Sequence, residues 1–516
     1  MSALRVLSQG LTNNQRLRHI IGGPDFLCVL SAIAEILFAF SRALSRVIER
    51  TEFPAKTQSR KVLKLKLRPL KTMLLKRIQL FFLVLLLASV SVRADKVDDS
   101  IKSEMQKQHL PGLSLVVIND SKTIKSQGYG LANVELNVPA NPETVYKIGS
   151  VSKQFIATGI MLLVEEGKLS LDDPISKFLE GTPDTWKTIT VRHLLTHTSG
   201  IVREAPGFDP LKIQADADVI KTAYSLPLRF APGDKWEYCN VGYFSLAEII
   251  HKVTGKPWGD YLKERVFAPL GMNSTRTTTM TDMVQNRANG YVWSEGTLRN
   301  ATNYIALRPS GAFLSTVLDL AKWDEALYSD KILKQTTLNQ MWTRVKLNDG
   351  KTHDYGFGWE LETVGSHKLI HHGGSLPGFR AQFARFVDDK ITIAVLTNGD
   401  NADAGSIALG VAKFYIPGLI PERIVARIDQ KVFDTYVGHY QPDPSTVFIV
   451  TREADKLMFQ QGLNGERREL LPESTTDFFT RERPRATYSF SKDAAGQMYL
   501  VLKVEGREEG RAKKIK

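Results

Sequence analysis

Segments with the alternating pattern of β-strands lie at both ends of the central part of the chain, and a long helix-rich stretch separates them. The early segments, 113–118 and 123–129, flank a turn and predict a β-hairpin. The late segments are 368–371, 382–387 and 391–396. Because an isolated hairpin needs partner strands, we expect both sets to share one sheet. The predicted fold class is therefore α+β, an antiparallel sheet flanked by helices with an inserted helical subdomain.

The end of the chain has a different pattern. Pro417 and Pro421 favour a linker over residues 416–431. Residues 432–516 then contain six short alternating segments: 447–451, 456–460, 469–471, 478–481, 487–491 and 498–504. Regular short strands separated by turn residues predict a small antiparallel β-barrel domain.

The positive charge is concentrated at the N-terminus. The whole chain of 516 residues has a net charge of +13. Residues 1–94 carry 16 Lys or Arg against 4 Asp or Glu, whereas the remaining 422 residues carry 52 against 51. The body of the protein is therefore almost neutral, and we expect no nucleic-acid partner.

A secretory signal peptide is predicted at residues 73–94. It begins with a short basic segment at Met73, continues with the apolar residues 78–92, and ends in small or apolar residues before Ala94. The apolar run is short for a membrane span, which favours a cleaved signal over an uncleaved anchor. An uncleaved anchor is the only membrane contact we expect, and the predicted location is periplasmic or secreted.

Residues 1–72 precede that signal, although a signal peptide belongs at the start of a protein. We interpret them as an upstream extension that is non-native or disordered, with translation beginning at Met73. The competing interpretation makes 26–40 a further membrane helix, although Glu35 interrupts it. Of the two cysteines, only Cys239 lies beyond this leader, so no disulfide can form within the mature chain.

A hydroxyl and an amine lie three residues apart at Ser150 and Lys153, where an apolar helix predicted to end at Gly167 begins. Side chains at i and i+3 of a helix share a face, so the amine can activate the hydroxyl as a nucleophile. The same S-x-x-K pattern recurs at Ser489 and Lys492, in a strand-like segment where these positions point to opposite faces. Chance gives about two copies of this pattern in a chain this long, so other motifs must decide whether Ser150 and Lys153 are catalytic.

Two further motifs lie later in the chain. Tyr238-Cys239-Asn240 precedes a helix predicted over 241–253, although a core tyrosine beside a turn asparagine is the commoner explanation of such a tripeptide. The segment Ile370 to Phe379 contains His-His-Gly-Gly-Ser, and we expect it to be a strand that runs into a glycine-rich turn with N–H groups open to a ligand. Strand alternation predicts that the first histidine points away from the second.

Together, S-x-x-K, Y-x-N and a basic residue followed by x-Gly resemble the motifs of the serine β-lactamase and penicillin-binding-protein superfamily. The closer resemblance is to its class C-like branch, which includes D-aminopeptidases, D-Ala-D-Ala carboxypeptidases and esterases. The stretches 193–200, 269–272 and 355–358 look like that branch as well. The resemblance covers about residues 96–415, and the predicted hydrolase domain is 95–415. Residues 432–516 are similar to the small β-barrels that often follow such hydrolases.

The resemblance implies seven site residues: catalytic Ser150, Lys153 and Tyr238, and substrate-binding Asn240, His372, Gly374 and Ser375. Ser150 is then the acylated nucleophile, and either Lys153 or Tyr238 is its base. Asn240 donates to the substrate amide or to Lys153. The backbone N–H groups of Ser150 and Ser375 form an oxyanion hole.

The third motif departs from the lysine that is usual in β-lactamases. His372 is mostly neutral at pH 7, which favours peptidase and esterase relatives over an efficient β-lactamase. We therefore expect an exported serine hydrolase that forms an acyl-enzyme on peptide, amide or ester substrates, most like a D-amino-acid peptidase. A class C-like β-lactamase or a carboxylesterase is the alternative. A non-catalytic ligand-binding sensor on the same fold is the alternative outside enzymes.

Neither a metal nor a cofactor is expected. His193 and His197 have i, i+4 spacing, but no glutamate lies beside either as in H-E-x-x-H zinc sites. The chain lacks the G-x-S-x-G of α/β-hydrolases, and it has no phosphate-binding or dinucleotide-binding glycine motif. The oligomeric state is not indicated.

Overall fold

The computed structural model describes residues 95–516 apart from 280, 305–307, 312, 421–422, 464, 482, 484 and 505. The predicted signal peptide and upstream extension lie outside the described residues. Among the residues that are described, none of the helices has the length and apolar character needed to cross a bilayer.

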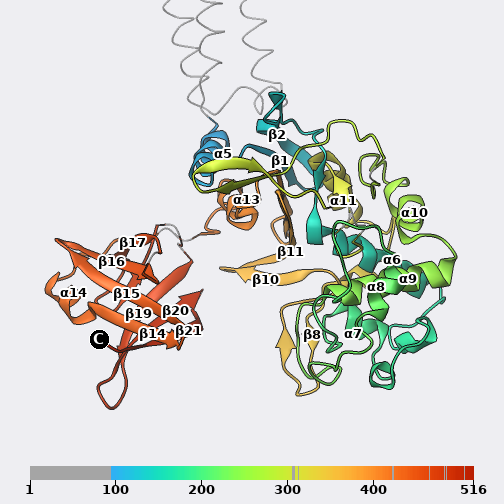
Figure 1. Cartoon of the computed structure of the whole chain (residues 1–516). Helices are drawn as coiled ribbons and strands as arrows, with labels where there is room; N and C mark the ends of the chain where they lie inside the picture. The colour runs from blue at the N-terminus through green and yellow to red at the C-terminus, as the bar shows by residue number, and fades with distance from the viewer. Residues whose placement is uncertain are drawn as a thin grey trace, which may run out of the picture. The chain divides into compact units, whose positions relative to one another are not determined.

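One antiparallel sheet joins the two ends of the hydrolase region (Figure 1). In the described part of the chain its seven strands follow the order β10 (Glu360–Val364), β11 (His367–Leu376), β12 (Phe379–Phe386), β13 (Ile391–Thr397), β1 (Gly112–Asn119), β2 (Lys122–Asn133) and β3 (Val138–Pro139). The early β1 pairs with the late β13, with Leu113 opposite Thr397. The predicted sheet shared by both ends of the region is confirmed.

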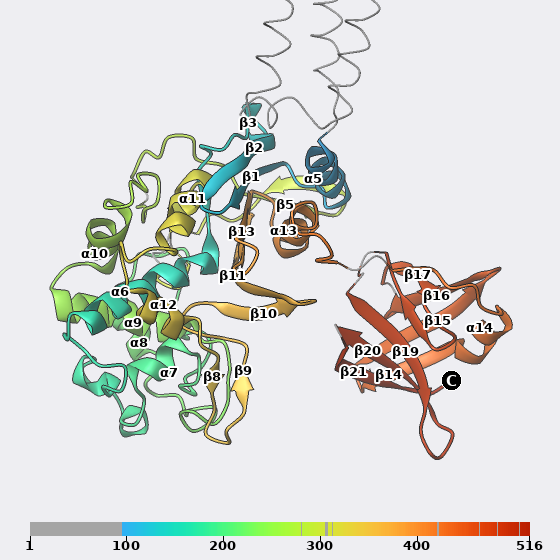
Figure 2. The same ribbon diagram turned by 180° about the vertical axis from the view of Figure 1, so that it is seen from behind.

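Helices cover both faces of this sheet, which explains why β1 is buried from Gly112 to Ile118. Leu115 and Val117 pack in a cluster with α5 (Lys96–Lys107) and α13 (Ala404–Ala412). Val116 and Ile118, on the opposite face, pack in a second cluster with the inserted helices. Figure 2 shows α5 close to α13, away from α6 and α9.

The inserted helices lie between the hairpin and the late strands, as predicted. They are α6 (Lys153–Glu165), α7 (Val191–Leu195), α8 (Asp216–Lys221), α9 (Asn240–Thr254), α10 (Trp258–Leu262), α11 (Val317–Ala326) and α12 (Gln335–Met341). Helix α6 is buried over most of its length, and Gly167 follows it with a left-handed φ of 67°. That conformation ends the helix where the sequence predicts.

The C-terminal region is a closed antiparallel barrel. In the described residues its strands are β14 (Gly438–Asp443), β15 (Thr446–Glu453), β16 (Lys456–Gln461), β17 (Arg467–Pro472), β18 (Asp477–Phe479), β19 (Ala486–Lys492), β20 (Met498–Val504) and β21 (Arg507–Lys514). The six predicted strands are confirmed. The first and last strands were not predicted, and they close the barrel by pairing Tyr440 with Lys514. The domain limits at 415 and 432 stay predictions.

Candidate active site

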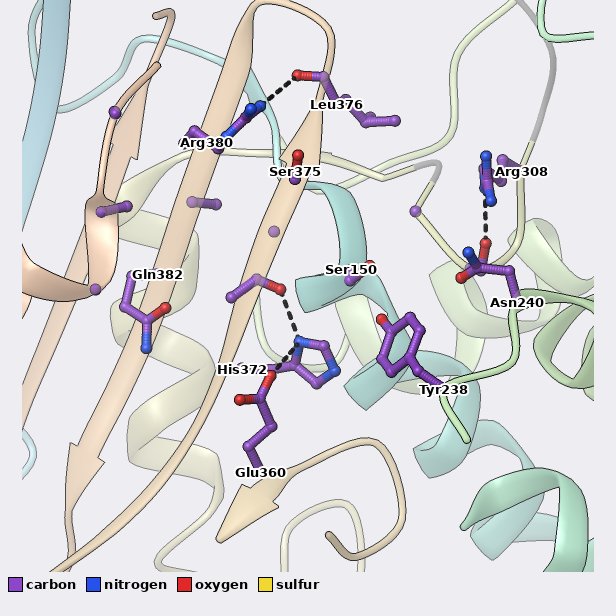
Figure 3. Close-up of a pocket in the computed structure, with 18 of the residues that line it drawn as sticks. Ser150, Tyr238, Asn240, Arg308, Glu360, His372, Ser375, Leu376, Arg380 and Gln382 are labelled. Carbon is purple, nitrogen blue, oxygen red and sulfur yellow. Dashed lines mark hydrogen bonds and ion pairs between the residues drawn. The ribbon is translucent and has the colours of Figure 1, made fainter. Parts of the chain in front are cut away.

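A cavity of about 530 Å³ opens where the start of α6, the start of α9 and strand β11 meet. Six of the seven predicted site residues line it: Ser150, Tyr238, Asn240, His372, Gly374 and Ser375. The seventh, Lys153, is fully buried and in contact with Ser150. Segments far apart in the sequence therefore bring the predicted residues to one place. Figure 3 shows five of them together: Ser150, Tyr238, Asn240, His372 and Ser375.

Ser150 and Lys153 meet through local structure alone. Ser150 lies in the 3₁₀ turn η1 (Gly149–Ser152), and Lys153 is the first residue of α6. Side chains at i and i+3 of a 3₁₀ turn eclipse each other, which brings them closer than in an α-helix. The Nζ atom of Lys153 lies 3.1 Å from the Oγ atom of Ser150.

The Lys153 amine has two further partners inside the protein. Its Nζ donates to Asn240 Oδ1 at 3.0 Å and to the carbonyl oxygen of Ser310 at 2.8 Å. Burial of the amine, followed by the nearby charge of Arg308, holds the pKa of Lys153 well below its ordinary value of 10.5. A neutral amine has two N–H groups and one lone pair, so those two acceptors leave the lone pair for the Ser150 hydroxyl.

Asn240 contacts Lys153, but the predicted direction of the hydrogen bond is wrong. Its Oδ1 accepts from Lys153, because its Nδ2 is used to donate to Glu204. Glu204 is held in turn by Arg308. Asn240 is the first residue of α9, directly after the buried Cys239 at the N-cap. The helix start thus fixes the amide that receives the lysine.

Tyr238 lies beside the nucleophile. In Figure 3 its hydroxyl points toward Ser150. Burial raises the pKa of the Tyr238 phenol above its ordinary value of 10.0, and a hydrogen bond with Ser150 opposes that rise only in part. The phenol is therefore protonated at neutral pH.

Strand β11 brings its backbone against the nucleophile turn. Strand β10 pairs with β11 only up to His371, and η1 packs beside β11 beyond that point. A Cβ atom on Gly374 would lie 1.9 Å from the Ile148 carbonyl oxygen, and one on Gly149 would lie 2.6 Å from the Ser375 nitrogen. Both positions require glycine. The backbone of Gly149, directly before Ser150, therefore lies against the backbone N–H of Ser375.

One prediction about this strand is wrong. Gly373 and Gly374 lie inside β11, not in a glycine-rich turn, and the turn comes later at Gly378, whose φ is 76°. The close approach of η1 explains glycines within the strand. The prediction that the two histidines point apart is confirmed, because His372 lines the first cavity and His371 lines a second one.

A chain of hydrogen bonds fixes the state of His372. Its Nδ1 donates to the Gly373 carbonyl at 2.7 Å, so in the neutral ring Nε2 must accept, and the Tyr355 hydroxyl lies 3.1 Å from it. The same hydroxyl lies 3.2 Å from His197 Nε2, while His197 Nδ1 accepts from the Cys239 backbone N–H at 3.1 Å. Tyr355 thus accepts from His197 and donates to His372, and both rings are neutral.

The electrostatics agree with this chain of hydrogen bonds. Burial lowers the pKa of His372 from 6.5 to about 4, against an opposing effect of Glu360. Burial also holds the pKa of His197 well below its ordinary value. The site therefore presents no positive charge from histidine at neutral pH. The surroundings of His372 support the prediction that it is neutral at pH 7, unlike the lysine of β-lactamases.

His193 and His197, which have i, i+4 spacing in the sequence, make different hydrogen bonds. His193 Nδ1 accepts from the Thr190 N–H at 3.1 Å and caps α7, whereas His197 belongs to the hydrogen-bond chain above. Within the described ranges, no group of three His, Cys, Asp or Glu side chains is placed to hold a metal ion. Burial raises the pKa of the Cys239 thiol to about 12, as expected for a packed side chain.

Several residues of the site were not found from the sequence: Glu204, Arg308, Ser310, Tyr355 and Glu360. Tyr355 lies in a stretch that resembles the class C-like branch, which is the one signal that could have found it. The others are isolated polar residues in no motif. Only the fold brings them to the cavity.

Comparison with known proteins identifies the family. A family model described as Beta-lactamase matches residues 97–414. The chain belongs to the Beta-lactamase family. This Beta-lactamase match spans the sheet, the inserted helices and the cavity, and it confirms the predicted superfamily.

Other members of this group are similar over most of their lengths. The chain is 32% identical over 412 residues to penicillin-binding protein 4* of Bacillus subtilis (strain 168), covering 74% of this chain and 90% of that protein. Among solved structures, it is similar to the octameric penicillin-binding protein homologue from Pyrococcus abyssi, with 27% identity and a TM-score of 0.57, covering 82% of this chain and 100% of that one. A D-amino acid amidase from Ochrobactrum anthropi SV3, complexed with L-phenylalanine amide, matches with 26% identity and a TM-score of 0.54, covering 62% of this chain and 98% of that one. This chain is a Beta-lactamase-family hydrolase.

Proposed function

We propose that this protein is a serine hydrolase that forms an acyl-enzyme on Ser150 and cleaves amides or short peptides of D-amino acids. The observation that carries the proposal is the 3.1 Å contact between Ser150 Oγ and the fully buried Lys153 Nζ, at the wall of an open cavity. A binding protein has no need to bury an amine beside a serine, because burial of a lysine costs free energy.

The protonation states favour a division of work between the two candidate bases. Lys153, with its lowered pKa, takes the proton from Ser150 as the hydroxyl oxygen attacks the substrate carbonyl. Tyr238, whose pKa is raised, stays protonated until the amine departs, gives its proton to that amine and regains one from the Lys153 ammonium. The N–H groups of Ser150 and Ser375 stabilise the negative charge that develops on the carbonyl oxygen. Water then attacks the ester and loses a proton to the neutral Lys153, and that proton passes to Ser150 Oγ as the ester bond breaks and the acid is released.

The proposed substrate class rests on the charge of the site and on its relatives. A neutral His372 gives no fixed cation for the carboxylate of a β-lactam, which disfavours efficient β-lactam hydrolysis. A similar structure is a D-amino acid amidase. An amide of a small D-amino acid is therefore the first substrate to test.

The first experiment labels the purified protein with a fluorophosphonate probe and maps the modified residue. We expect labelling at Ser150, and an unlabelled wild type would contradict the proposal.

The second experiment compares D-alanine p-nitroanilide, its L isomer, a p-nitrophenyl ester and a chromogenic cephalosporin. We expect the D-amide to be preferred over its isomer, whereas fast turnover of the cephalosporin would contradict the substrate class.

We also propose that the protein is exported by the signal at residues 73–94, with cleavage near Ala94. The support is the basic and apolar pattern of that segment. N-terminal sequencing of the native protein tests it: a start close to residue 95 is expected. Recovery of a peptide from residues 1–72 would contradict the assignment of that segment to an upstream extension.

A further inference from the structure

A second cavity of about 320 Å³ adjoins the first. Tyr238 and Glu360 line both cavities, so these two side chains form the partition between them. Ser150 lines only the first cavity, so Tyr238 and Glu360 separate it from the second one. Since Tyr238 is placed to protonate the departing amine, the second cavity is on the side where the leaving group of a substrate must lie.

Flat aromatic surfaces form part of the second cavity. The Trp236 ring stacks on the His353 ring, with centroids 4.0 Å apart and planes 9° apart. The Tyr238 ring lies 6.4 Å from the Trp236 ring. Aromatic faces attract the stem and the charge of a cationic side chain.

Two of the carboxylates at this cavity already have cationic partners. Asp354 pairs with Arg344 at 2.6 Å and with Arg507 at 3.3 Å. Glu362 pairs with Arg485 at 2.6 Å and with His371 at 3.3 Å. Their charges are therefore balanced within the protein.

Glu360 is different. Over the part of the chain that the structure describes, no lysine or arginine lies within ion-pair distance of it, and its only such neighbours are His372 at 3.7 Å and His371 at 3.9 Å. The hydrogen bonds of His372 keep that ring neutral. The Glu360 side chain is 43% exposed, so its carboxylate is open to a ligand at the partition.

The charge of the first cavity is uneven as well. Arg308 and Arg380 lie on the opposite side of Ser150 from Glu360 in Figure 3. Glu204 pairs with Arg308 and also lies 3.9 Å from Arg203, whose guanidinium lies 5.2 Å over the Tyr238 ring. Arg380 donates to the carbonyl oxygens of Leu376 and Phe379. A cation on the substrate is therefore favoured at the Glu360 end of the site.

Resting on the proposed function, we propose that the second cavity is a subsite for a cationic side chain, an ammonium or guanidinium group, on the leaving residue of the substrate. Glu360 is its specificity-determining residue and pairs with that charge. Trp236 contacts the aliphatic stem. Glu360 takes no part in the bond-breaking step.

The test compares two substrates that differ in one charge, D-alanyl-lysinamide and D-alanyl-norleucinamide. We expect kcat/KM of the wild type to favour the lysine substrate by about tenfold, as for a partly screened ion pair. Glu360→Gln should remove this preference by lowering only the value for the lysine substrate. Glu325→Gln, which changes an exposed carboxylate of α11, is the matched control and should leave both values unchanged.

Ionic strength gives a readout that a merely structural role would not affect. Salt screens a partly exposed ion pair, so the preference of the wild type should shrink as salt is added, and that of Glu360→Gln should not. Equal losses on both substrates in Glu360→Gln, or a wild type without preference, would overturn the proposal.

Failure of the proposed function can be told apart from failure of the subsite. If the wild type cleaves neither dipeptide amide, the peptidase function is wrong. The subsite is then tested by protection of Ser150 from fluorophosphonate labelling. Better protection by lysinamide than by norleucinamide, lost in Glu360→Gln, supports it, and equal protection overturns it.

Discussion

The pattern S-x-x-K occurs twice in this protein, and the two copies have different surroundings. Ser150 and Lys153 lie in a 3₁₀ turn and the first turn of a helix, with their polar atoms 3.1 Å apart. Ser489 and Lys492 lie in strand β19 of the barrel, where Ser489 is buried and donates to Asp477, and Lys492 is exposed. Secondary structure, and not the pattern itself, decides whether hydroxyl and amine meet.

Loss of the nucleophile should have the largest effect. We expect Ser150→Ala to lower ester or amide hydrolysis by about 10⁴-fold or more, because the residue forms the covalent bond. Ser489→Ala should leave the rate unchanged and cost about 1 kcal/mol of stability, the value of one hydrogen bond. Steady-state kinetics and thermal unfolding measure both. Fluorophosphonate labelling that persists in Ser150→Ala would contradict the assignment of Ser150 as the nucleophile.

Replacement of the amine should have the next largest effect. Because only a neutral Lys153 accepts the serine proton, activity should fall as the pH drops through its pKa, which lies well below 10.5. Lys153→Arg should lower kcat/KM by about 10²- to 10⁴-fold and lose this acidic limb, because guanidinium does not deprotonate. Lys492→Arg is the control. A wild-type rate that rises only near the ordinary lysine pKa would contradict the role of burial.

A glycine lies close to each copy of the S-x-x-K pattern, and its substitution tests whether the local backbone matters for catalysis. Gly149 has a φ of 53°, and a Cβ atom there would lie 2.6 Å from the Ser375 nitrogen. We expect Gly149→Ala to lower kcat by about 10²- to 10³-fold, as for loss of an oxyanion donor. Gly496, close to the second copy, has a φ of 80° and nothing within 4 Å of a Cβ position. Gly496→Ala should cost only about 1 kcal/mol of stability. Equal kinetic losses would contradict the proposed oxyanion hole.

The smallest effect concerns stability and pH. The folded protein holds the pKa of His372 at about 4, against 6.5 for the free side chain. As the pH falls from about 6.5 to about 4, the unfolded chain takes up a proton at this residue that the folded chain does not. The free energy of unfolding therefore decreases over this pH range. His372 accounts for up to about 3 kcal/mol of that loss. Chemical denaturation at both ends of this pH range should show a smaller loss in His372→Gln. Equal losses in both proteins would contradict a neutral His372.

Much of the fold could be predicted because local sequence patterns determine its helices and strands. Helix α6 and its end at Gly167 follow from apolar periodicity and one glycine, and six barrel strands follow from alternation. Strands β14 and β21 could not be found this way. Arg507–Lys514 is rich in charge and has only Ala512 buried, so its pairing with β14 and β20, and not its own composition, makes it a strand.

The candidate active site also has features that the sequence predicts and features that only the tertiary structure reveals. By itself the sequence determined the nucleophile turn, because Ser150 and Lys153 meet within a few residues, and it determined which motifs belong together. Only the tertiary structure decided the lowered pKa of Lys153, the hydrogen bonds that keep His372 neutral, and the place of Glu360 between two cavities. These properties come from burial and from contacts between residues far apart in the chain, and no local pattern encodes such contacts.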